Sequence, residues 1–135
     1  KKGRGFAWEA DINLKDLINH HKKSKKKATI TAVKPPGRFG SLEFERGKVI
    51  NFHEKPKGDG FWVNGGFFIL EPSVLDLVSG DLCVWEQKPL KKLSKNRELN
   101  AFKHNGFWQP MDTLRDKNNL ERLWSLDEAP WKIWK

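Results

Sequence analysis

The sequence has one cysteine, Cys83, and no tyrosine among its 135 residues. A single cysteine excludes a disulfide within the chain, as is usual for proteins of a reducing compartment. No apolar run approaches the ~20 residues of a membrane-spanning helix, and these residues contain no signal peptide and no Asn-x-Ser/Thr acceptor. We therefore expect a soluble, cytoplasmic protein without a membrane partner.

Several common catalytic and metal-binding motifs are also absent. There is no Gly-x-Ser-x-Gly elbow of serine hydrolases, no Walker-type phosphate loop and no Gly-x-Gly-x-x-Gly fingerprint. The histidines do not combine with the cysteine at zinc-site spacings; they are His20, His21, His53 and His104. The remaining candidates are polar groups near the ends of predicted strands.

The chain is rich in aromatic residues and in positive charge. Seven Trp and nine Phe indicate a folded core, and the length fits one domain over residues 1–135. The net charge of +9 favours anionic partners: nucleic acid, nucleotides, phosphosugars or acidic surfaces. Much of the excess lies in residues 20–27, and such a run is more often a solvated helix end than a binding site.

The first half of the chain predicts one helix followed by strands. Asn13 is the expected N-cap, with Asp16 at the third helical position. A buried stripe is then expected at Leu14, Leu17, Ile18 and His21. Residues 28–33 are β-branched and apolar, which predicts a strand buried on both faces.

Residues 41–45 and 48–54 alternate apolar and polar residues around Arg46-Gly47 and predict a β-hairpin. Residues 61–70 predict a strand interrupted at Asn64-Gly65-Gly66.

Further on we expect a short helix over 71–80, two helical pieces around Pro89 and a strand over 100–108. A last helix begins near residue 112, and the aromatic tail packs back on the body or on a neighbouring subunit. The predicted fold is α/β, a mixed and mostly parallel sheet flanked by helices.

Three places could carry chemistry, and each has an ordinary structural explanation as well. Glu54-Lys55 at a strand end could hold hydroxyls and a phosphate, or form a surface ion-pair neighbourhood. Asn64-Gly65-Gly66 could let backbone approach a sugar, or form a bulge. Asp112 could hold a cation, or cap the last helix.

Asp112 is not the only residue that could cap the last helix. Thr113 can cap the helix instead, with Asp116 completing a capping box.

Two long blocks, residues 35–76 and residues 102–135, resemble the sugar-phosphate nucleotidylyltransferase family. Within that family they are similar to the glucose-1-phosphate cytidylyltransferases. The resemblance runs from about Asp11 to the C-terminus. It implies the C-terminal part of a Rossmann-like nucleotidylyltransferase fold. It also implies attack of glucose 1-phosphate on the α-phosphorus of CTP, which gives CDP-glucose and pyrophosphate.

The resemblance implies roles for particular residues. Lys55 would be the catalytic residue that holds the sugar phosphate, and Glu54 would hold glucose hydroxyls. Asp112 would be a ligand of a catalytic Mg²⁺. The sugar pocket would be lined by Asn64, Gly65 and Gly66.

The chain departs from the family pattern at its start. The Gly-rich triphosphate loop is absent from these residues, and Gly3-Arg4-Gly5 stands where a Gly-Asp-Gly element is expected. We therefore expect residues 1–10 to be diverged or unrelated, and the rest to be the C-terminal, sugar-phosphate-binding half. The isolated chain is then expected to be inactive.

Alternatives remain for its biological role. The chain could be a non-catalytic remnant for sugar-phosphate binding or oligomerisation, and a basic nucleic-acid-binding module ranks last. The expected partners are a sugar phosphate, with a nucleotide as a second candidate. We also expect a homo-oligomer or a missing N-terminal half.

Overall fold

The computed structural model describes residues 8–35, 37, 41–53 and 61–134. The chain forms two compact units. We call residues 13–32 with 64–104 the sheet unit, and residues 1–12, 33–63 and 105–135 the tail unit. The expectation that residues 1–135 act as one domain stays a prediction.

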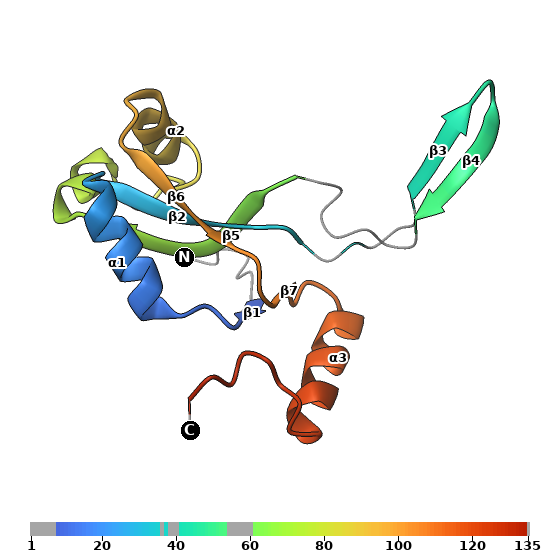
Figure 1. Ribbon diagram of the computed structural model, residues 1–135. Helices are drawn as coiled ribbons and strands as arrows, with labels where there is room; N and C mark the ends of the chain where they lie inside the picture. Colours follow the sequence, from blue (N-terminus) through green and yellow to red (C-terminus); the bar gives the residue numbers. More distant parts are fainter. Residues whose placement is uncertain (1–7, 36, 38–40, 54–60, 135) are drawn as a thin grey trace. The chain divides into compact units, whose positions relative to one another are not determined.

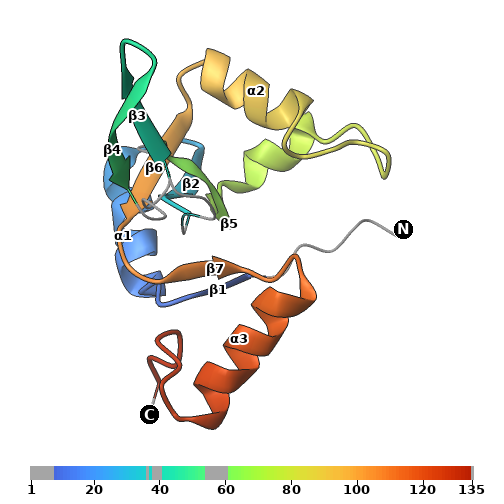
Figure 2. The ribbon, with the colours of Figure 1, turned by 90° about the vertical axis from the view of Figure 1, so that its right-hand side faces the viewer.

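The sheet unit contains three strands, two α-helices and a 3₁₀ helix (Figure 1). In chain order these elements are α1 (Leu14–Ser24), β2 (Ala28–Val33), β5 (Val63–Leu70), η2 (Pro72–Leu77), α2 (Lys88–Lys95) and β6 (Leu99–His104). The strand order is β5-β2-β6. Viewed from two directions, α1 and α2 lie on opposite sides of this sheet (Figure 1, Figure 2).

Backbone hydrogen bonds at the start of β2 set the strand directions. The Ala28 amide donates to the Glu98 carbonyl at 3.2 Å, so β2 and β6 start side by side and run parallel. The Glu71 amide donates to the Lys27 carbonyl at 2.8 Å, so the end of β5 meets the start of β2 and these strands are antiparallel. The predicted mixed α/β class is confirmed, with both kinds of pairing in one sheet.

Successive side chains of a strand point to opposite faces, and β2 is buried on both. Ala28 packs with Val74 and Leu93, from η2 and α2. Thr29 faces the other side, where it hydrogen-bonds to His21 of α1. The predicted two-sided burial of residues 28–33 is confirmed.

Helix α1 begins as predicted. The Asn13 side chain accepts hydrogen bonds from the amides of Lys15 and Asp16, which confirms the N-cap. Leu17 and His21 are buried. The predicted four-residue stripe is too wide, because Leu14 is 55% exposed and Ile18 is 38% exposed. The buried face of α1 is thus narrower than its apolar pattern indicates.

Two helical predictions in the sheet unit need correction. Pro89 does not divide two helical pieces. It lies in the first turn of α2. Backbone N–H groups of the first turn have no intrahelical acceptor, so the absence of an N–H in proline costs no helical hydrogen bond there. Residues 81–87 form turns instead of a helix. The short helix predicted over 71–80 is the 3₁₀ helix η2, which ends at Leu77.

The tail unit contains two antiparallel strand pairs and one helix. Its elements are β1 (Trp8–Ala10), β3 (Ser41–Glu45), β4 (Lys48–His53), β7 (Trp108–Pro110) and α3 (Leu114–Ser125). β1, which the sequence did not indicate, pairs with β7. The strand predicted over 100–108 is therefore two strands, β6 and β7, separated by residues 105–107.

The predicted hairpin is confirmed as β3–β4. Arg46 and Gly47 have φ of 50° and 78°, and a two-residue hairpin turn of type I′ requires positive φ at both positions. One face carries the cross-strand pairs Leu42–Phe52 and Phe44–Val49. All four of these apolar side chains are at least half exposed.

The tail packs back on its own chain, one of the two predicted outcomes. The Trp131 ring stacks on Phe107 at 5.7 Å and on Trp124 of α3 at 6.4 Å, measured between ring centroids. Trp131 is buried. Among the described residues, no helix is both long enough and apolar enough to cross a bilayer.

The capping contacts of α3 show whether Asp112 or Thr113 is the N-cap of this helix. The Thr113 hydroxyl accepts from the Asp116 amide at 3.1 Å, and the Asp116 carboxylate accepts from the Thr113 amide at 3.2 Å. This reciprocal pair is a capping box. Thr113 is therefore the N-cap, and the alternative that Asp112 caps the helix is wrong.

We expect Thr113→Ala to lower the free energy of unfolding by about 1 kcal/mol, because it removes the N-cap acceptor. Asp112→Ala should lower it by less than Thr113→Ala does, because Asp112 is not the N-cap. Urea unfolding of both variants checks this. Equal losses in the two variants would contradict the assignment of the cap.

Candidate functional site

The Asn64-Gly65-Gly66 segment forms a side-chain-stabilised turn within β5. The Gly66 amide donates to Asn64 Oδ1 at 2.8 Å. Gly66 has φ of 88°, a left-handed conformation that favours glycine. Gly65 is buried and Asn64 is exposed. The strand continues through this irregularity instead of breaking, and it presents an amide side chain beside bare backbone.

Asp112 lies directly before the N-cap of α3. Its side chain is exposed, and its backbone amide donates to Asp116 Oδ2 at 3.2 Å. Asp116 also accepts from the Gln109 side chain at 3.3 Å and belongs to the capping box. Of these two carboxylates, Asp116 serves the helix start, while Asp112 lies where the positive end of the helix dipole favours an anion.

The predicted site residues do not all lie in one described unit. Glu54 and Lys55 lie outside the described residues, directly after β4, which ends at His53. Asn64, Gly65 and Gly66 belong to the sheet unit, and Asp112 belongs to the tail unit. Of the predicted site residues, the three of the β5 turn are neighbours in the chain and lie together in the sheet unit, and Asp112 lies in the other unit.

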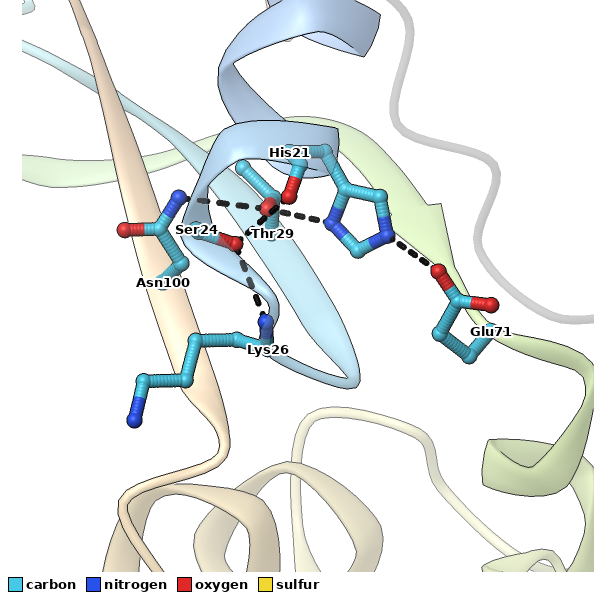
Figure 3. A network of polar contacts seen from close by, with 6 residues as sticks. All are labelled: His21, Ser24, Lys26, Thr29, Glu71 and Asn100. Carbon is cyan, nitrogen blue, oxygen red and sulfur yellow. Dashed lines mark hydrogen bonds and ion pairs between the residues drawn. The ribbon is translucent and has the colours of Figure 1, made fainter.

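A buried polar network lies elsewhere in the sheet unit (Figure 3). His21 Nδ1 lies 2.7 Å from Thr29 Oγ1, and His21 Nε2 lies 2.8 Å from Glu71 Oε1. The Asn100 amide donates to Thr29 Oγ1 at 3.4 Å. These residues come from α1, β2, β6 and the position directly after β5, so the network joins four segments of the unit.

The donors and acceptors of this network assign the imidazole tautomer. An ionised Glu71 carboxylate only accepts, so His21 carries its proton on Nε2. In the neutral ring Nδ1 then accepts from the Thr29 hydroxyl, which in turn accepts from Asn100. Thr29 has no exposed surface, which excludes it as a nucleophile for an outside substrate. The network is structural, although it pairs a hydroxyl, an imidazole and a carboxylate.

The predictions from sequence placed His21 on a buried stripe but did not identify its partners. A histidine at an apolar helical position is a usable signal, because a buried imidazole needs hydrogen-bond partners. Which residues supply them depends on how α1 crosses the sheet.

An open hollow of about 480 Å³ lies in the turn region before α2. Its lining is formed by residues 79–84 together with Gln87 and Lys88, and it includes none of the predicted site residues. Within the described ranges, no group of three or more His, Cys, Asp or Glu side chains could hold a metal ion.

Comparison with known proteins identifies the family. The family profile of the nucleotidyl transferases matches residues 8–109, which include the β5 turn and end before Asp112. This chain belongs to the nucleotidyl transferase family. The match covers most of the chain, and the predicted resemblance is confirmed at this level.

Individual nucleotidyl transferases are similar over most of this chain. It is 58% identical over 125 residues to a glucose-1-phosphate cytidylyltransferase of Salmonella typhi, which is 93% of this chain and 49% of that protein. It is 35% identical over 114 residues to a mannose-1-phosphate guanyltransferase of Debaryomyces hansenii, covering 77% of this chain and 32% of that protein. The chain spans about half the length, or less, of these relatives.

A solved structure supports the nucleotidyl transferase fold. It is a crystal structure, in complex with sucrose, of a Bacillus anthracis protein assigned as a glucose-1-phosphate thymidylyltransferase. The TM-score is 0.54 at 16% identity, and the match covers 91% of this chain and 51% of that chain. The similarity is one of fold, in agreement with a Rossmann-like architecture.

We expect His21→Leu to lower the free energy of unfolding by about 1–3 kcal/mol, because the buried Thr29 hydroxyl loses its acceptor. The neighbouring His20 is exposed, and its Nε2 lies 2.9 Å from the Ala101 carbonyl. His20→Leu is the matched control, with an expected loss below about 1 kcal/mol. Thermal unfolding measures both. An equal or larger effect at His20 would refute the structural role of His21.

Proposed function

We propose that this chain is the sugar-phosphate-binding part of a glucose-1-phosphate cytidylyltransferase. The 58% identity over 93% of the chain to such an enzyme carries the proposal. The lower identity to a guanyltransferase that acts on another sugar phosphate favours the cytidylyl reaction over other members of the family. The reaction forms a bond between the sugar phosphate and the α-phosphorus of CTP and releases pyrophosphate.

In this proposal Lys55 holds the sugar phosphate, and Glu54 accepts hydrogen bonds from glucose hydroxyls. An ammonium group is a compact point charge suited to a phosphate, and a carboxylate accepts several hydroxyl hydrogens. The turn at Asn64, Gly65 and Gly66 lines the sugar pocket. The exposed Asn64 amide beside backbone without side chains supports this role, because a sugar ring can approach it closely.

Asp112 is the proposed protein ligand of Mg²⁺. Magnesium prefers oxygen and is often bound through one or two carboxylates together with water and substrate phosphates. The Asp112 residue is exposed at the start of α3, which fits that role, and the capping box itself consists of Thr113 and Asp116. When bound, Mg²⁺ would supply charge neutralisation for the phosphates.

Phosphoryl-type transfer depends mainly on positioning and charge stabilisation. Within these 135 residues only the sugar-phosphate part of that machinery is recognised. The proposal includes a second half that holds the nucleotide triphosphate, either on the same polypeptide or on another. A non-catalytic remnant with sugar-phosphate affinity remains the alternative outcome.

Two further expectations belong to the proposal. A cytoplasmic location stays a prediction that rests on the lack of disulfides and on the substrates. Self-association also stays a prediction, supported by the exposed apolar face of the β3–β4 hairpin, because such faces mark interaction sites.

We predict that the 135 residues alone form no CDP-glucose from CTP and glucose 1-phosphate in the presence of Mg²⁺, because no triphosphate loop is present. A coupled pyrophosphate assay measures this, with a full-length relative as positive control. Mg²⁺-dependent pyrophosphate release by the purified chain would overturn the prediction.

We predict that the chain binds glucose 1-phosphate and that Lys55→Met weakens the binding at least about 10-fold, through loss of a charge-assisted contact. Titration calorimetry measures the dissociation constant. Lys48→Met, in the hairpin, is the matched control and should leave it unchanged.

Asp112→Asn tests the metal ligand in the same titration. Mg²⁺ should tighten binding by the unmodified chain and have little effect on this variant. Unaltered binding by Lys55→Met would remove Lys55 from the site. Sugar-phosphate binding without any effect of Mg²⁺ in the unmodified chain would favour the non-catalytic remnant.

A further inference from the structure

Five cationic side chains gather where two turns of the sheet unit lie side by side. We call this cluster the basic end; its members are Lys25, Lys26, Lys27, Lys95 and Arg97. The first turn follows α1 and the second follows α2. All five side chains are exposed.

Backbone hydrogen bonds hold the two turns together. The amides of Lys27 and Ala28 both donate to the Glu98 carbonyl, at 3.1 and 3.2 Å. Lys25 and Arg97 each adopt left-handed backbone conformations, with φ of 56° and 57°. In Figure 3 the ammonium end of Lys26 points away from the His21 network. The cations are thus presented on a fixed backbone.

The basic end is not neutralised locally. Among the described residues, none of its five side chains takes part in an ion pair. Helix α2 carries four lysines and no acidic residue. Glu98, which follows Arg97 in the sequence, is half-buried, and Glu71 is hydrogen-bonded to His21. A mixture of both signs is usual on a soluble surface, so this composition is unusual.

Helix dipoles account for only part of this charge. Cations near a helix C-terminus are favourable, which explains Lys22 and Lys23 in α1 and Lys95 in α2. Lys26 and Lys27 lie beyond the end of α1, where the effect has fallen off. The helix dipole therefore does not account for these two lysines, whereas binding of an anionic surface would.

The apolar neighbours of the basic end distinguish between anionic partners. η2 follows Glu71, whose amide is bonded to Lys27, and its Leu75 is 64% exposed. Aliphatic side chains gain free energy at the acyl boundary of a bilayer. A nucleic-acid duplex is bound mainly through its phosphates and gains nothing from an exposed leucine, and single strands are bound by stacking on aromatic rings. The described aromatic residues of the sheet unit beyond α1 are all half-buried: Phe67, Phe68, Trp85 and Phe102.

We propose that the basic end, together with Leu75, is a docking surface for a bilayer rich in anionic phospholipid. The lysines and arginine contact headgroup phosphates, and Leu75 inserts at the boundary of the acyl chains. The expectation of no membrane partner rested on the length of apolar runs, which bears on spanning helices and not on a charged surface.

Flotation of the full chain with vesicles tests the proposal. We expect binding to equimolar phosphatidylglycerol and phosphatidylcholine, no binding to phosphatidylcholine alone, and release at high salt. Lys25→Gln with Lys26→Gln and Lys27→Gln should weaken binding about 100-fold, at about five-fold per lysine. Leu75→Ser should also weaken binding of the chain to these vesicles, and it should not alter binding of the chain to a DNA duplex.

A charge-matched control changes Lys15, Lys48 and Lys117 to Gln, outside the basic end. It should bind vesicles as the unmodified chain does, and circular dichroism verifies that both triple variants fold. Equal loss in the two triple variants would show a non-specific effect of net charge and overturn the proposal. Binding to a DNA duplex as tight as to the vesicles, with no effect of Leu75→Ser, would also overturn it.

Discussion

The start of β2 is the point on which the sheet unit depends. The carbonyl of Lys27 and the amide of Ala28 hydrogen-bond to the end of β5 and the start of β6, so three strands meet there. Beside this junction His21 bonds to Thr29 and Glu71, and it connects α1 to β2 and to the residue that follows β5. Since buried polar groups are costly when unpaired, each member of the network constrains the others.

This junction also positions the features with functional interest. The β5 turn at Asn64-Gly65-Gly66 lies on a strand whose other end is bonded to β2, so the turn is carried by an anchored strand. The basic end lies on the turns that enter β2 and β6. The proposed sugar-binding turn and the proposed lipid surface are thus built on the same strands, β5, β2 and β6.

Family membership and structure contribute different kinds of information. The nucleotidyl transferase match and the 58% identity identify the chemistry to test, but they concern a chain about half the length of the relatives. The structure adds a specific point about Asp112. Because Thr113 and Asp116 form the cap of α3, the need for a helix cap no longer explains an acidic residue at that position.

Local patterns in the sequence determined the elements whose cause is local. The N-cap at Asn13, the Arg46-Gly47 turn and the Thr113 capping box follow from side-chain chemistry within a few residues. Only the tertiary structure decided which faces are buried. Leu14 and Ile18 are exposed although they fit the apolar stripe. The pairing of β1 with β7, about a hundred residues apart in sequence, likewise depends on the tertiary structure. The hydrogen-bond partners of His21 were also decided by the tertiary structure, because hydrogen bonds between distant segments depend on how the helix crosses the sheet.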